Sequence, residues 1–128
     1  MNFLKLSFLL LLVAASFTAC SDDEESCLQA DWVGTYTGTA DCDGNSESTT
    51  VTITASGANE IVIVYVAGPV TTTFDPLPVD GCTIFRENSA GGITGSVEAV
   101  LDGDDLTVTE ILTGGGFNTN CLVTATRQ

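Results

Sequence analysis

The sequence contains no histidine and very little positive charge. Its basic residues are Lys5, Arg86 and Arg127, against 17 Asp and Glu among 128 residues, which gives a formal net charge of −14. Without imidazole, and without lysine beyond residue 5, most catalytic triads, Schiff-base sites and His-ligated metal centres are excluded. The negative charge repels phosphate groups, which excludes nucleic-acid binding as a main role. We expect neither a cofactor nor a nucleic-acid partner.

Catalysis by the remaining side chains has little support in the sequence. Serine and threonine nucleophiles have no His to activate them, and the only Lys lies in the first few residues. Such hydroxyl groups are weak nucleophiles without an adjacent base. Paired carboxylates could act as acid and base, but no two of them stand in a recognisable motif. We therefore predict that the protein is not an enzyme.

Two acidic segments have the residue types of calcium ligands without the spacing. Residues 41–45 place Asp, Asp and Asn at alternate positions, as the first ligands of a calcium loop do. However, the glycine comes at position four instead of six, and Thr52 stands where the loop needs a Glu. Residues 102–105 have the composition of a hairpin tip. We interpret both as polar turns and predict no metal site, while weak calcium binding at them stays open.

The apolar residues are concentrated at the N-terminus. Lys5 precedes an apolar run over residues 8–15, and small residues follow before Cys20. This order is typical of a secretory signal peptide. A membrane-spanning helix needs about 20 apolar residues, so the run is too short to cross a bilayer. We predict a signal helix over residues 1–19 and an exported mature chain.

Residues 17–20, Phe-Thr-Ala-Cys, resemble a bacterial lipobox, in which small residues precede a cysteine. Phe17 stands where a lipobox usually has Leu. The resemblance implies that Cys20 is lipidated and becomes the first residue of the mature protein. Two or more acyl chains give stable attachment where one chain does not. Contact with the membrane is then expected only through the lipid.

An acidic cluster follows the predicted lipidation site directly, and it consists of Ser21, Asp22, Asp23, Glu24 and Glu25. The cluster resembles the lipoprotein export signal of Bacteroidetes-type bacteria, which implies display on the outer face of the outer membrane. A solvated acidic tether is the plainer interpretation of such a run, and the two are compatible. Residues 20–31 are thus predicted to be a tether that carries the lipid anchor.

Four cysteines remain after lipidation, and an even set in an exported chain predicts two disulfides. Residues 32–40 read as a strand, which spans roughly 30 Å at about 3.3 Å per residue. Since a disulfide needs Cα atoms within about 7 Å, the pair Cys27–Cys42 is disfavoured. We favour Cys27–Cys121 with Cys42–Cys82, because the first bond would join the two ends of the domain. The alternative, Cys27–Cys82 with Cys42–Cys121, stays open.

The body of the chain alternates short β-branched runs with turn residues every roughly 8–12 positions, which is typical of an all-β sandwich or barrel. Apolar and polar residues alternate within the runs, so that Val51 and Ile53 share one face, as do residues from Ile93 to Leu101 and from Phe117 to Ala125. The candidate strands are 32–40, 48–55, 60–67, 70–74, 82–87, 93–101, 106–113 and 117–126.

Short connections favour a sequential antiparallel meander. Eight strands are enough to close into a small up-and-down barrel, whose interior either fills with side chains or holds one small ligand. A two-sheet β-sandwich is the alternative architecture. The predicted domain is 32–128.

Residues 32–39, residues 93–96 leading into residues 101–108, and Cys121 near the end resemble the lipocalin-like domains that are common among small secreted lipoproteins. A lipocalin signature places Gly two residues before the Trp, where this chain has Ala30. The resemblance implies a barrel closed at one end by an arginine on a tryptophan. Neighbouring first and last strands would bring Trp32 and Arg127 together, and a guanidinium on an indole contributes about 0.5–2 kcal/mol.

Two function classes follow from these observations. The resemblance favours a binding module for a small apolar or amphipathic molecule. The charge favours an acidic interaction or inhibitor module that engages a basic partner protein. We expect a monomer in either case.

Overall fold

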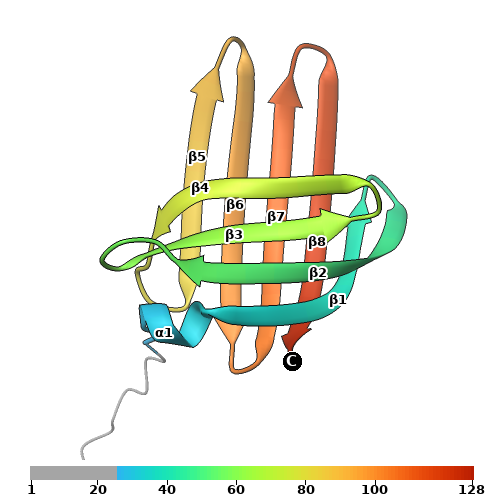
Figure 1. The fold of residues 1–128 in the computed structure, drawn as a ribbon. Helices are drawn as coiled ribbons and strands as arrows, with labels where there is room; N and C mark the ends of the chain where they lie inside the picture. Colours follow the sequence, from blue (N-terminus) through green and yellow to red (C-terminus); the bar gives the residue numbers. More distant parts are fainter. Residues whose placement is uncertain (1–25) are drawn as a thin grey trace, which may run out of the picture.

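The computed structural model describes residues 26–128, so the predicted signal helix, Cys20 and residues 21–25 lie outside the described part of the chain. One short helix and eight strands make up the fold (Figure 1). Their bounds are α1 (Gln29–Trp32), β1 (Gly34–Cys42), β2 (Asn45–Ala55), β3 (Glu60–Ala67), β4 (Val70–Pro78), β5 (Thr83–Ala90), β6 (Ile93–Asp102), β7 (Asp105–Gly114) and β8 (Phe117–Arg127).

The strands form a nearly closed up-and-down barrel, which confirms the predicted fold class. Their order is β4-β3-β2-β1-β8-β7-β6-β5, and every neighbouring pair is antiparallel. Each of the eight predicted segments corresponds to one observed strand. The first and last strands pair with each other as predicted, and the ends of the sheet are instead β4 and β5 in the middle of the chain.

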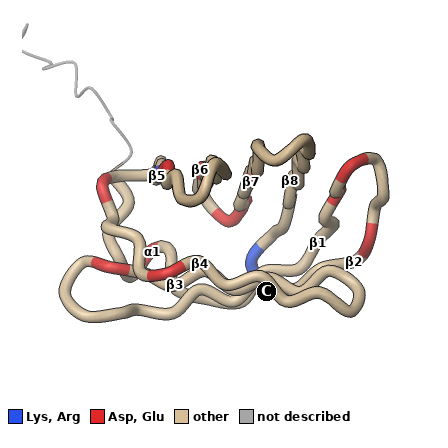
Figure 2. Tube along the Cα trace, turned by 90° about the horizontal axis from the view of Figure 1, so that it is seen from above, with Lys and Arg blue, Asp and Glu red and all other residues tan. Residues whose placement is uncertain are grey.

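The barrel is flattened into two layers of strands. Strands β1–β4 lie in one layer and β5–β8 in the other, and the two sets run across each other with the core between them (Figures 1 and 2). Side chains alternate between this core and solvent, as a strand period of two requires. The largest fully buried side chains are Trp32, Tyr36, Tyr65, Ile53, Ile61, Ile63, Leu77, Leu106, Val51, Val108 and Val123.

The seam between β4 and β5 is bridged by a side chain. Pro76 and Pro78 lie on β4 and have no N–H, so this strand cannot continue a full ladder onto a neighbour. Arg86 on β5 reaches across, and its Nη1 donates to the carbonyls of Asp75 at 3.5 Å and Pro76 at 3.3 Å. The seam is therefore held by side-chain hydrogen bonds where the other strand pairs have backbone ladders.

One end of the barrel is plugged by α1 and Trp32. The sequence predicted Trp32 at the start of the first strand, but it ends the helix, and β1 begins at Gly34. The indole is fully buried, and its Nε1 donates to the Gly81 carbonyl at 3.1 Å. Gln29 holds the helix against the β2–β3 turn through carbonyls of that turn. No helix within residues 26–128 is long and apolar enough to cross a membrane.

Arg127 lies over Tyr36 and not over Trp32, which corrects the predicted closure contact. Its guanidinium carbon is 4.9 Å from the centre of the Tyr36 ring. The cause is register, because Arg127 stands opposite Tyr36 in the β1–β8 pair while Trp32 precedes the strand. Nη1 donates to the Val33 carbonyl at 2.7 Å, Nη2 donates to the Asp31 carbonyl, and Nε pairs with Asp104 at 3.3 Å.

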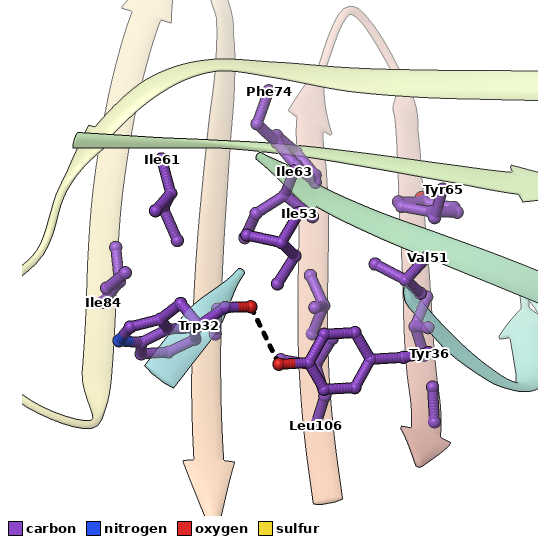
Figure 3. Close-up of a cluster of buried hydrophobic side chains, with 14 of the residues drawn as sticks. Trp32, Tyr36, Val51, Ile53, Ile61, Ile63, Tyr65, Phe74, Ile84 and Leu106 are labelled. Carbon is purple, nitrogen blue, oxygen red and sulfur yellow. Dashed lines mark hydrogen bonds between the residues drawn. The ribbon is translucent and has the colours of Figure 1, made fainter. Parts of the chain in front are cut away.

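The Tyr36 hydroxyl joins this network. It accepts a hydrogen bond from Arg127 and donates to the Trp32 carbonyl at 2.8 Å (Figure 3). Arg127 therefore fixes the backbone on both sides of Trp32 instead of stacking on its indole. The predicted contact between the Arg127 guanidinium and the Trp32 indole is thus replaced by a contact between Arg127 and Tyr36.

The disulfides are Cys27–Cys82 and Cys42–Cys121, so the favoured connectivity was wrong and the alternative is correct. Cys42 and Cys121 stand directly opposite each other on β1 and β8. Cys27 precedes α1, which packs beside the loop that carries Cys82. The exclusion of Cys27–Cys42 is confirmed.

Replacing Arg127 with Ala should lower the free energy of unfolding by about 2–4 kcal/mol, because charged hydrogen bonds and a cation–π contact are lost together. Trp32 emission should shift to the red as α1 loosens. Urea unfolding and fluorescence measure both effects.

Arg86→Ala is the matched control, because it removes the other arginine of the described chain without touching Trp32. It should leave the emission unchanged. An Arg127→Ala protein with an unaltered urea midpoint and emission would contradict the closing role of Arg127.

Candidate ligand-binding cavity

A cavity of about 390 Å³ lies at the end of the barrel away from Trp32. The size of the inward side chains explains its position. The plugged end carries Trp32, Ile61 and other large residues, whereas Ala40 and Ala67 occupy inward positions near the opposite end. The cavity is lined by Ala40, Cys42, Asn45, Glu47, Tyr65, Ala67, Pro69, Val70, Thr72, Glu110, Leu112, Thr119 and Cys121.

A second cavity of about 220 Å³ adjoins the first beneath the seam between β4 and β5. The two share Thr72, Glu110 and Leu112 as lining residues, and we call them together the cup. Arg86 lines only the second cavity. The combined size is in the range of small-molecule sites, which are about 300–1,000 Å³ and mostly apolar with a few polar groups.

Glu110 is the carboxylate at the centre of the cup. It follows Leu106 and Val108 on β7, so alternation directs it inward and leaves it half-buried. Across the sheet it stands between Val97 on β6 and Cys121 on β8, both of them buried. Sequence reasoning did not single out this residue. The sequence does contain a signal for it, because a Glu occupies a position that alternation assigns to the apolar inner face of this strand.

Tyr65 fixes the orientation of this carboxylate. Its hydroxyl donates to Oε2 of Glu110 at 2.6 Å, and only 2% of the residue is exposed. Burial, together with the hydrogen bond to Glu110, raises the pKa of Tyr65 to about 12, although a hydrogen bond with Thr72 opposes the shift. The ring also packs against Phe74, with centroids 6.1 Å apart. At neutral pH the phenol is a fixed donor on the wall of the cup.

The remaining predicted site residues fall into two groups. Cys42–Cys121 forms part of the cup wall, whereas Trp32, Arg127 and Cys27–Cys82 belong to the plugged end. The acidic segment 41–45 forms the β1–β2 turn, in which Asp43 binds the backbone of Asn120 through both its N–H and its Oδ1. Within residues 26–128 no group of His, Cys, Asp and Glu side chains is arranged to hold a metal ion.

This arrangement can bind and orient a small molecule. Apolar and small side chains form most of the wall, and one tyrosine–carboxylate pair offers directional contacts. No family model matches the chain, and neither a curated protein nor a solved structure shows significant similarity to it. What the cup does therefore has to be argued from its own side chains.

The chain contains two tyrosines, which makes their ionisation easy to follow. Burial raises the pKa of Tyr36 as well, with the nearby Arg127 opposing the shift. We predict that in the folded protein Tyr65 ionises near pH 12 and Tyr36 ionises above its ordinary pKa, which tyrosinate absorbance measures. The pKa of Tyr65 is higher in the folded protein than in the unfolded chain. Its contribution to the free energy of unfolding is therefore complete below pH 10 and is lost as the pH rises toward 12.

Tyr65→Phe is the control, since it should remove the transition near pH 12 and leave that of Tyr36. Ionisation of either tyrosine at its ordinary pKa in the folded protein would contradict the burial of these hydroxyls.

Proposed function

We propose that the protein is an exported, monomeric lipoprotein whose barrel binds one small amphipathic molecule in the cup. The observation that carries this proposal is the cavity of about 390 Å³, with small and apolar walls and a single oriented tyrosine–carboxylate pair. A barrel whose interior is packed at one end and hollow at the other is compatible with a binding module.

The proposed lipid anchor fits the position of the chain's entry into the fold. Cys27 is bound to Cys82 at the plugged end, next to α1. The tether therefore joins the barrel at the end opposite to the cup. Anchored through Cys20, the domain would hold the cup away from the membrane surface, where a ligand from the medium can enter.

The anchor is tested by replacing residues outside the described fold. Cys20→Ser should release the protein in soluble form, because the lipidated thiol is lost. Replacing residues 22–25 with Ala should keep the protein in the membrane but hide it from protease added to whole cells. The wild-type protein should be membrane-bound and cleaved. If the Ala variant stays accessible to protease, residues 22–25 do not direct display.

Ligand binding is tested by filling the cup. Ala67→Phe places a ring in the cavity, whereas Val66→Phe adds the same group to the outer face of the same strand. In native mass spectrometry of the Cys20→Ser protein, a copurified molecule of about one equivalent should persist in Val66→Phe and vanish in Ala67→Phe. Both variants should melt within a few degrees of the parent.

Loss of the molecule from both variants, or retention by both, would remove the cup as the binding site. An empty parent protein after gentle purification from its native cell would count against the proposal as a whole.

A second candidate function is an acidic module for a basic partner protein. The observation that favours it is the placement of both arginines of the described chain. Arg86 bridges the seam and Arg127 binds the plugged end, so most surface carboxylates of this part of the chain have no arginine beside them. Acidic positions occur on the turns of both layers (Figure 2). A partner held by these carboxylates would dissociate as salt rises, whereas a ligand in the cup would bind almost equally at low and high salt.

A further inference from the structure

The charges around the cup define the ligand more closely. We propose that the cup selects a molecule with a protonated amine and an apolar body, in which the amine binds Glu110. This inference rests on the proposed function and names the class of ligand for the same site.

The larger cavity has acidic lining residues without a basic one. Glu47 and Glu110 are its ionisable carboxylates, and neither Lys nor Arg contributes to its wall. Within residues 26–128 the one ion pair joins Arg127 to Asp104 at the plugged end, far from Glu110. Glu110 takes part in no ion pair of the described chain, because Arg86, which lines the smaller cavity with it, is not within ion-pair distance. No cation of these residues faces Glu110 from the larger cavity. An ammonium group on the ligand would supply the missing positive charge.

Hydrogen bonding at Glu110 leaves room for such a group. Tyr65 donates to Oε2, and within residues 26–128 no protein donor is paired with Oε1. An ammonium has three donors and no acceptor, so it matches a carboxylate and cannot accept from Tyr65. An alcohol can also donate to Glu110, but an ammonium adds a full positive charge beside the carboxylate, which favours an amine at this position.

An anionic ligand fits the cup less well. Arg86 is the one cation within residues 26–128 that lines the cup, but it lines only the smaller cavity, and its Nη1 donates to the Asp75 and Pro76 carbonyls across the seam. A carboxylate in the larger cavity would instead meet Glu47 and Glu110 in a protein with a net charge of −14. Like charges this close disfavour the ionised form of the ligand and weaken its binding.

The walls provide for the apolar body. Ala40, Val70 and Leu112 line the cavity beside the Cys42–Cys121 disulfide. Beyond it, the hairpins β5–β6 and β7–β8 extend past β4 (Figure 1). Ile93 and Phe117 lie in the inward register of these hairpins and are 40% and 46% exposed. A chain longer than the cavity could therefore continue along an apolar surface.

Three ligands with the same ten-carbon chain isolate the head group. Decylamine, decanol and decanoate are titrated into the purified Cys20→Ser protein by calorimetry at pH 7, below their aggregation limits. Decylamine should bind at one equivalent and about tenfold or more tighter than decanol, and decanoate should bind weakest. Glu110→Gln should bring decylamine to within about twofold of decanol, while decanol itself changes little.

Glu98→Gln is the matched control, because Glu98 is exposed on the outer face of β6 and its removal changes the net charge equally. It should leave the preference for decylamine intact. Thermal melting checks that both variants are folded. Equal loss of decylamine binding in Glu98→Gln, or binding of several equivalents, would mean adsorption to the acidic surface and would overturn the proposal.

The outcomes separate this inference from the proposed function. If all three ligands bind equally, or decanoate binds tightest, the amine preference is wrong while the cup remains a ligand site. If none of the three binds and no molecule copurifies, the ligand-binding function itself fails.

Discussion

The antiparallel pairing of β1 with β8 is the constraint on which the rest of the molecule depends. It joins the two layers, and its register decides what stands at each end of the barrel. At one end it places Arg127 beside Tyr36, and at the other it places Cys121 opposite Cys42. Between them the strands approach closely at Gly38, where an added Cβ would lie 1.9 Å from the Thr124 carbonyl oxygen. One strand pair thus positions both the plug and a wall of the cup.

The two ends differ because the same alternating strands carry large inward residues at one end and small ones at the other. Trp32, which lies on helix α1 and not on a strand, completes the packed half. In the hollow half, small side chains and the half-buried Glu110 leave space that an apolar core would have filled. Such a cavity forgoes packing contacts that would stabilise the fold. The proposed binding function would account for a half-buried carboxylate in this hollow half.

Most of the fold could be predicted from the sequence because it depends on local signals. Strand period and turn residues located all eight strands, although the fourth was predicted to end at residue 74 and extends to Pro78. The errors arose where tertiary position decides. The sequence around Trp32 is typical of a strand start, but Trp32 lies on α1, which packs at the end of the barrel. The position of that helix also decides which cysteine lies beside Cys27. Ile93 faces inward as predicted but stays exposed, because the opposite layer does not extend over it.

The distribution of positive charge connects the fold to the site. The described chain has two arginines, and both are engaged in closing the barrel: Arg127 binds the carbonyls beside Trp32, and Arg86 binds those of β4 across the seam. Neither forms an ion pair with Glu110, although Arg86 lines the smaller cavity with it. Under the proposed ligand class, the positive charge that pairs with this carboxylate comes from the ligand. The same scarcity of cations that argues against nucleic-acid binding therefore also underlies the proposed preference of the cup for an amine.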